Sequence, residues 1–282
     1  MNPDERLSKI RERIDVIDSR LLELISERAR CAQEVAQVKL DALQSDETPP
    51  VFYRPEREAQ VLRAIQERNP GPLASEHIAS VFREIMSSCL ALEQPLSVAF
   101  LGPEGTYSQA AALKHFGQSA IPRGQASIQK VFRQVEERLC DYGVVPVENS
   151  TEGMVGQTLD CFLDSSLQIT GEIELPVVHH LLAGQGAEQS DIQLILGHEQ
   201  ALGQCRQWLN SHLPEVPREA VASNGEAARR AAVETGVAAI AGELAAGLHQ
   251  LDTLASTIQD SSTNTTRFLV LGKETVPPSG HD

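Results

Sequence analysis

Residues 7–40 decide the fold of the first part of the chain, and they read LSKIRERIDVIDSRLLELISERARCAQEVAQVKL. Apolar side chains recur here at helical spacing without Gly or Pro, at Ile10, Ile14, Ile17, Leu21, Leu24, Ile25, Ala32 and Val35. At about 1.5 Å per residue, such a helix runs roughly 50 Å, which exceeds the width of a domain of about ninety residues. The apolar stripe therefore predicts a partner helix, and we expect a homodimer through the N-terminal helices.

Two shorter helices follow in the sequence. Thr48-Pro49-Pro50 interrupts the helical pattern, residues 56–68 resume it, and residues 69–72, which read NPGP, interrupt it again. A third helix is predicted over residues 75–93, and Pro95 ends it. We predict an all-α domain over residues 1–94.

The cations of the first helix bear on its chemistry. Arg28 and Lys39 are eleven positions apart and return to within roughly 20° of each other, so both can contact one anion. Arg11 lies some 25 Å further along the helix, where only a partner chain could bring it to the same small ligand. Spacing alone favours three solvated side chains on an amphipathic helix over an anion site.

The second part of the chain alternates between strands and helices. We predict strands over 96–101, 142–147, 167–171, 174–182 and 194–196, and helices over 110–116, 200–210, 225–234 and 242–247. Polar clusters follow the first two strands, at 102–109 and 148–153, and another, at 263–267, precedes a final strand. This pattern predicts a two-lobed α/β domain over residues 96–272 and a polar tail over 273–282.

Composition excludes several classes of function. The chain has 24 Lys and Arg against 39 Asp and Glu, a net charge of −15, so binding to nucleic acid or to an anionic membrane is not expected. Five cysteines without CxxC spacing suggest neither disulfides nor a zinc site. No carboxylate or thiolate lies at metal-ligand spacing from His179, His180 or His198. With no signal peptide and no apolar span, we expect a cytoplasmic protein without a metal.

A spaced set of residues runs through the helical domain: Leu7, Ile10-Arg11, Ile14-Asp15, Asp18, Leu21-Leu22, Leu24, Glu27-Arg28, Val35, Lys39, Arg57-Glu58 and Val61-Leu62. This set resembles the helical chorismate mutase family over nearly all of residues 5–93. The resemblance implies an intertwined dimer in which Arg11 of one chain joins residues of the other around chorismate, namely Arg28, Lys39, Arg57 and Glu58. Cations suit a substrate with two carboxylates that must be held folded, and Lys39 is our candidate contact to its ether oxygen.

This domain departs from the family pattern at three positions: Arg54 replaces a frequent Asp, Cys89 a frequent Ser, and Glu93 a Gln that donates to the ether oxygen. We expect Cys89 and Glu93 to lie at the chorismate site. An ionised carboxylate can only accept hydrogen bonds, so Glu93 must be protonated to take over this role. Mutase activity should therefore rise as the pH falls.

Three motifs mark the second domain: Gly102-Pro103 with Gly105-Thr106-Tyr107-Ser108, Val145–Ser150 with Gly153, and Asn264 with Thr266-Arg267-Phe268. Their order resembles prephenate dehydratases over about residues 97–272. The resemblance implies two lobes, similar in fold to periplasmic binding proteins, that close over prephenate. It assigns catalysis to Thr266 and a substrate carboxylate to Arg267. The other expected substrate-binding positions are Thr106, Ser108, Glu148, Asn149, Ser150, Gln204 and Ser223.

The combined resemblance implies a bifunctional enzyme that needs no cofactor. Gly197 and Asn224 stand where relatives often carry hydroxyl side chains, so fewer donors are expected from the second lobe. Relatives normally continue into a phenylalanine-binding ACT domain, for which residues 273–282 leave no room, so inhibition by phenylalanine is not expected of this chain. Two alternatives remain open: a dehydratase with a non-catalytic helical dimerisation domain, and a small-molecule-binding module without catalysis.

Overall fold

A computed structural model describes residues 2–41 and 52–277. The chain divides into two compact units. Among the described residues, one comprises the chain up to Pro95 with the short segment Gly117–Ser119, and the other comprises Leu96–Phe116 and Ala120–Val276. The predicted interruption at Thr48–Pro50 and the end of the polar tail lie outside the described residues.

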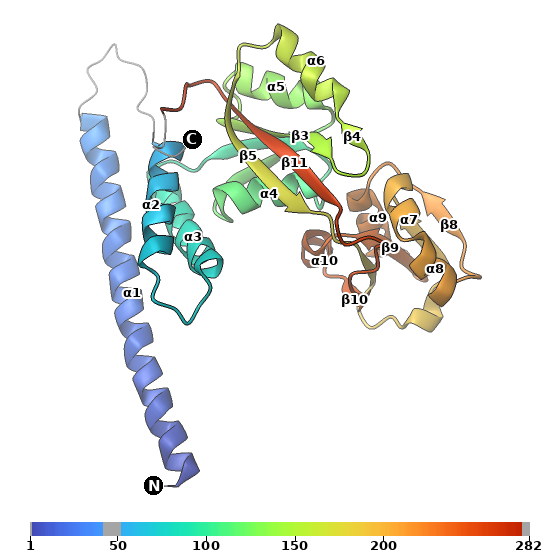
Figure 1. Cartoon of the computed structure of the whole chain (residues 1–282), viewed down its shortest axis with the longest axis horizontal. Coiled ribbons are helices and arrows are strands. Elements are labelled where there is room, and N and C mark those ends of the chain that lie inside the picture. Colours follow the sequence, from blue (N-terminus) through green and yellow to red (C-terminus); the bar gives the residue numbers. More distant parts are fainter. Residues whose placement is uncertain (1, 42–51, 278–282) are drawn as a thin grey trace. The chain divides into compact units, whose positions relative to one another are not determined.

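The first unit contains the three helices expected from the sequence. They are α1 (Pro3–Asp41), α2 (Pro55–Arg68) and α3 (Ser75–Glu93). Pro55 occupies the first turn of α2, where its missing N–H costs no hydrogen bond. Helix α3 packs against both other helices (Figure 1). The all-α prediction for this part of the chain is confirmed.

Helix α1 leaves its apolar stripe uncovered within one chain. Ile10 is 55% exposed and Leu21 is 50% exposed, although both are apolar, and Ala36 is the buried residue of this helix. Figure 1 shows α2 and α3 beside the C-terminal half of α1, while the N-terminal half extends beyond them. A continuous exposed apolar stripe of this kind marks an interaction surface.

The first lobe of the second unit is built on a six-stranded sheet with the order β2-β1-β3-β11-β5, to which β4 adds by pairing with β3. The strands are β1 (Ser97–Leu101), β2 (Ile121–Gln125), β3 (Tyr142–Asn149), β4 (Gly153–Met154), β5 (Gln168–Pro176) and β11 (Thr265–Gly272). Helices α4 (Tyr107–Phe116), α5 (Ile128–Glu136) and α6 (Gly156–Asp164) cover the sheet. Strands β1, β2 and β3 are parallel, whereas β11 runs antiparallel to its neighbours β3 and β5.

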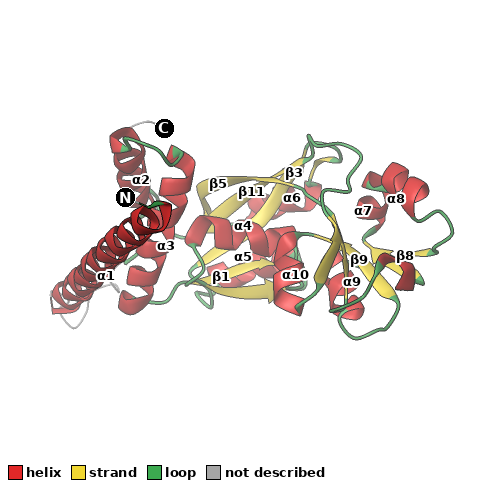
Figure 2. Ribbon diagram, turned by 90° about the horizontal axis from the view of Figure 1, so that it is seen from below, coloured by secondary structure: helices red, strands yellow, loops and turns green. Residues whose placement is uncertain are grey.

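The second lobe contains a five-stranded sheet with the order β10-β6-β9-β7-β8 (Figure 2). Its strands are β6 (His180–Ala183), β7 (Leu194–Gly197), β8 (Arg218–Ala220), β9 (Val237–Ala241) and β10 (Asp252–Ala255). Its helices are η1 (Gln189–Asp191), α7 (Glu199–Gln204), α8 (Arg206–His212), α9 (Asn224–Ala231) and α10 (Glu243–His249). Apolar clusters pack on both faces of the central strand β9, so each lobe has its own core.

The structure corrects several predicted bounds. Residues 168–176 form one strand, β5, because the backbone at Gly171 pairs with Val270 of β11 instead of ending the strand. The predicted helix 200–210 is two helices separated at Cys205. Strand β3 extends through Asn149, and β11 begins at Thr265, so two of the polar clusters lie partly in strands.

The chain crosses between the two lobes twice, after β5 and before β11. The lobes approach closely where the loop before α4 meets the start of α9. A methyl group on Gly225 would collide with the backbone carbonyl oxygen of Glu104, and Gly105 adopts a φ of +79° beside Ala245. The absence of side chains at these two glycines therefore permits the observed approach.

Candidate active sites

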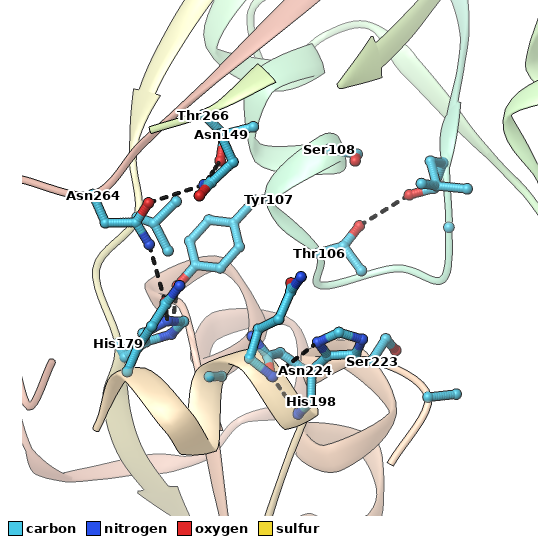
Figure 3. A pocket seen from close by; sticks show the side chains of 17 residues that line it. Thr106, Tyr107, Ser108, Asn149, His179, His198, Ser223, Asn224, Asn264 and Thr266 are labelled. Carbon is cyan, nitrogen blue, oxygen red and sulfur yellow. Dashed lines mark hydrogen bonds between the residues drawn. The ribbon is translucent and has the colours of Figure 1, made fainter. Parts of the chain in front are cut away.

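A polar cavity of about 260 Å³ lies between the two lobes of the second unit (Figure 3). Both lobes contribute to its wall. The predicted residues that line it are Thr106, Ser108, Asn149, Gln204, Ser223 and Thr266. The wall also includes polar side chains that sequence reasoning did not assign to the site: Tyr107, His179, His198, Gln200, Asn224 and Asn264.

The glycine turn before α4 forms one end of the cavity. The backbone N–H of Gly105 donates to Gln109 Oε1 at 2.6 Å, and Thr106 Oγ1 lies 2.9 Å from the Pro103 carbonyl, to which it donates. These bonds hold the turn while the buried Ser108 hydroxyl lies in the first turn of the helix. The N-terminal end of a helix has N–H groups without intrahelical partners and a positive dipole end, which suit a carboxylate, and the N-terminal end of α4 lies at this turn.

Thr266 is held by the neighbouring strand. Asn149 Nδ2 donates to Thr266 Oγ1 at 2.8 Å, and this pair faces the cavity (Figure 3). Asn149 Oδ1 accepts from the backbone N–H groups of Thr151 and Glu152, at 3.0 and 3.1 Å, which fixes its amide orientation. Because Oγ1 accepts from Asn149, the hydroxyl hydrogen of Thr266 remains available to a ligand.

The second lobe uses some of its cavity side chains to hold its own helix ends. Ser223 caps α9 by accepting from the backbone N–H of Glu226 at 3.1 Å. Asn224 Oδ1 accepts from the backbone N–H of His198 at 2.8 Å. These two contacts shape the wall, and Asn224 is held there by the backbone of His198.

Arg267, Glu148 and Ser150 are not among the residues that line the cavity, in contrast to the expectation from the family pattern. The side chains of successive residues in a strand point to opposite faces of the sheet. Because Thr266 points toward the cavity, Arg267 points away from it. The Arg267 guanidinium donates to Glu148 and to Glu172, each at 2.8 Å. The hydrogen bond from Arg267 holds the pKa of Glu172 below its usual range.

Ser150 supports the loop that precedes β11. Its hydroxyl donates to the Thr263 carbonyl at 3.3 Å and accepts from the backbone N–H of Thr265 at 2.9 Å.

Asn264 lies two positions before Thr266 and reaches the same cavity. This two-residue period is the sequence signal that could have identified Asn264 once Thr266 was chosen.

In the helical unit, Arg28 and Lys39 lie close enough to Glu93 to interact with its charge. Partial burial raises the pKa of Glu93 above its ordinary value, while the positive charges of Lys39 and Arg28 oppose that rise. Lys39 Nζ also lies 5.0 Å from the centre of the Phe52 ring. The structure thus brings together three of the predicted mutase residues.

The other predicted mutase residues are placed differently. Glu58 lies 3.5 Å from Arg83 Nε, and burial raises the pKa of its carboxyl despite this contact. Arg57 is exposed on α2, Cys89 is buried on α3, and Arg11 is exposed on the extending half of α1. At about 1.5 Å per residue, Arg11 lies roughly 25 Å along α1 from Arg28.

The part of the chain that the structure describes also bears on metal binding and on membrane insertion. There, no group of three or more His, Cys, Asp or Glu side chains is placed to hold a metal ion. Its helices likewise include none that is long and apolar enough to cross a membrane.

Comparison with known proteins matches both units. Residues 10–94 match the family described as chorismate mutase type II, and residues 98–276 match prephenate dehydratase. A Pseudomonas aeruginosa protein named bifunctional chorismate mutase/prephenate dehydratase is 56% identical over 282 residues, which cover 100% of this chain and 77% of that protein. An Escherichia coli K12 protein of the same name is 31% identical over 300 residues, covering 98% and 75% of the two chains.

A solved structure of prephenate dehydratase from Arthrobacter aurescens, in complex with L-Phe, has a TM-score of 0.61 and 31% sequence identity. That match covers 65% of this chain and 62% of the other. The helical unit and the two-lobed unit thus define an enzyme with two catalytic domains. The chain belongs to the bifunctional chorismate mutase/prephenate dehydratase family.

The enzyme rearranges chorismate to prephenate and converts prephenate to phenylpyruvate, two steps of aromatic amino acid biosynthesis. The first reaction belongs to the helical domain and the second to the α/β domain. The comparisons favour this interpretation over a non-catalytic helical domain or a binding module without catalysis.

Proposed function

We propose that Thr266 is the general acid of the dehydratase reaction and that Asn149 activates it. The observation that carries this role is the hydrogen bond from Asn149 Nδ2 to Thr266 Oγ1 at 2.8 Å. Among described residues, no hydrogen bond uses the Thr266 hydroxyl as a donor, so its proton is available to the departing hydroxyl of prephenate. The Asn149 N–H would stabilise the negative charge that develops on Oγ1.

In this scheme the proton of Thr266 moves to the ring hydroxyl, and the carbon–oxygen bond breaks to release water. The bond between the ring and its carboxylate breaks in concert, and its electron pair completes the aromatic ring as CO₂ leaves. Thr266 regains a proton from solvent, so one proton is consumed for each phenylpyruvate formed. Because a threonine hydroxyl is a weak acid, the drive to aromaticity and the alignment in the cleft must supply much of the acceleration.

The substrate carboxylates need fixed donors, and the cavity supplies neutral ones. We assign one carboxylate to the N-terminal end of α4 with the Ser108 hydroxyl, because the single hydrogen of the Thr106 hydroxyl already goes to the Pro103 carbonyl. Gln204 and Ser223 approach from the second lobe. Arg267 has no direct contact in this assignment, because its guanidinium is held by two carboxylates on the other face of the strand.

Replacement of the hydroxyl tests this assignment. Thr266→Ala should lower kcat for prephenate by roughly 10²–10⁴-fold, the usual contribution of a general acid. Thr266→Ser retains the hydroxyl and should retain much more activity. Chorismate turnover to prephenate, measured in the same samples, is the control for folding. Full dehydratase turnover by Thr266→Ala would disprove the role.

For the mutase, we propose a homodimer in which the exposed stripes of two α1 helices pack together. Arg11 of one protomer would then reach the Arg28, Lys39 and Glu93 cluster of the other. Support comes from the exposed apolar side chains of α1 and from the length of helix that separates Arg11 from Arg28 within one chain.

The cytoplasmic location also stays a proposal, which the five free cysteines support.

A further inference from the structure

A chain of side-chain hydrogen bonds runs around one side of the dehydratase cavity. Asn149 Nδ2 donates to Asn264 Oδ1 at 2.9 Å, and Asn264 Nδ2 donates to Gln204 Oε1 at 3.0 Å (Figure 3). Gln204 Oε1 also lies 2.9 Å from Nε2 of His179. Asn149 and Gln204 belong to different lobes, and Asn264 and His179 belong to the two segments that cross between them.

The orientation of each amide follows from the one before it. Backbone N–H groups can only donate, so the two that reach Asn149 Oδ1 fix the NH₂ group of Asn149 toward Asn264. Asn264 must then accept with Oδ1 and donate with Nδ2, which makes the atom of Gln204 that it contacts an oxygen. The protein thereby fixes Gln204 without any contribution from a ligand.

His179 must donate to this oxygen, so its hydrogen lies on Nε2. Its ring is 2% exposed, and burial lowers the pKa of His179, although the hydrogen bond to Gln204 opposes that shift. The neutral ring has one hydrogen, on Nε2, and Nδ1 faces the Tyr107 hydroxyl at 3.0 Å. Nδ1 can then only accept, so the single hydrogen of the Tyr107 hydroxyl, which lies 2.7 Å from the Val178 carbonyl oxygen, is shared between these two acceptors.

We propose that His179 is a positioning residue that locks the Gln204 amide so that its two N–H donors face prephenate. With Oε1 held by His179 and Asn264, the Nε2 atom of Gln204 has no hydrogen-bond partner among residues 2–41 and 52–277. An amide turned the other way would present an oxygen to an anionic substrate. This inference rests on the proposed binding of prephenate in the cavity.

The position of His179 also allows a simpler, structural role, because its ring packs edge-on against Tyr107 with the ring centres 5.8 Å apart. The two roles differ in which ring nitrogen matters. Positioning needs a donor at Nε2, whereas the contact with Tyr107 uses Nδ1.

Two substitutions of His179 distinguish the role of Nε2 from that of Nδ1. The side-chain amide of Gln reaches the position of Nε2, whereas that of Asn reaches the position of Nδ1. His179→Gln should keep the KM for prephenate within about twofold, and His179→Asn should raise it about tenfold with a smaller change in kcat, the scale of one hydrogen bond to a charged ligand. His212→Asn, an exposed site on α8, is the matched control and should leave KM unchanged.

A double-mutant cycle completes the test. In a Gln204→Met background there is no amide to orient, so His179→Asn should change KM by less than about twofold. A full tenfold effect in that background, or equal KM values for His179→Gln and His179→Asn, would overturn the positioning role. Failure of Thr266 as the acid would appear separately, as an unchanged kcat in Thr266→Ala.

Discussion

The two catalytic regions differ in how completely their side chains are held or covered within one chain. The dehydratase cavity is enclosed by two lobes of the same chain, and its polar side chains already hold one another in place. The mutase cluster lies on a helical unit whose longest helix exposes most of its apolar side chains. The polar network of the cavity is complete within one chain, whereas the uncovered apolar stripe of α1 supports the proposed dimer.

The difference also appears in the charges. The helical unit places two cations, Arg28 and Lys39, close to a partly buried carboxyl, that of Glu93. The dehydratase cavity is lined by hydroxyl, amide and imidazole groups, while the nearby Arg267 is held by Glu148 and Glu172. Substitutions should therefore affect the two activities independently, and the following predictions test that independence.

Removal of Arg11, the cation that lies far from Arg28 along α1, should have the largest effect. Arg11→Ala should lower mutase kcat/KM by roughly 10²–10³-fold, because a desolvated contact to a substrate carboxylate is lost. Turnover of added prephenate should stay at the wild-type level. Arg6→Ala, an exposed cation in an earlier turn of α1, is the control. Similar losses in both variants would mean that general charge, not a specific contact, explains the effect.

Substitution of Gly225, where the two lobes approach each other, should have the next largest effect. A methyl group at Gly225 meets the Glu104 carbonyl, so the lobes must separate slightly in Gly225→Ala, at a typical overpacking cost of about 1–3 kcal/mol. We expect the KM for prephenate to rise about tenfold, with mutase activity unchanged. Gly247→Ala, where no atom lies within 4 Å of the added methyl group, is the control. Equal KM values for the two variants would contradict the closure argument.

The carboxyl of Glu93 should give the smallest effect, visible as a pH profile. Burial raises its pKa, so the protonated, donating form grows as the pH falls, and the wild-type mutase should be several-fold faster at pH 6 than at pH 8. Glu93→Gln donates at every pH and should be faster than the wild type at neutral pH, with a flatter profile. No gain at neutral pH, or an unchanged slope, would exclude Glu93 as the donor.

The bounds of the helical unit were predictable because one period dominates it. Prolines mark the start of α2 and follow α3 closely, and the structure places α3 at Ser75–Glu93 as expected. In the α/β unit, Gly171 suggested a break that the pairing of β5 with β11 removes. Such pairing joins residues about a hundred positions apart, which local patterns do not reveal.

The residues of the candidate site were likewise predictable only in part. Motif resemblance pointed to Thr266, Asn149 and Gln204, which line one cavity. It also pointed to Arg267 and Glu148. The face of the sheet to which their side chains point depends on the bounds of β11 and β3. The partners His179 and Tyr107 lie 72 positions apart in the sequence, and only the folded chain brings them together.

The most direct test of the contrast between the two regions is subunit complementation. Arg11→Ala and Arg28→Ala chains, each without mutase activity alone, are co-expressed and assayed together with chorismate. Random pairing gives hybrid dimers in half of the molecules, with one intact site each, so about a quarter of wild-type mutase activity should return. Thr266→Ala and Asn149→Ala chains treated in the same way should recover no dehydratase activity. Failure of the mutase pair to recover, or recovery by the dehydratase pair, would contradict the account.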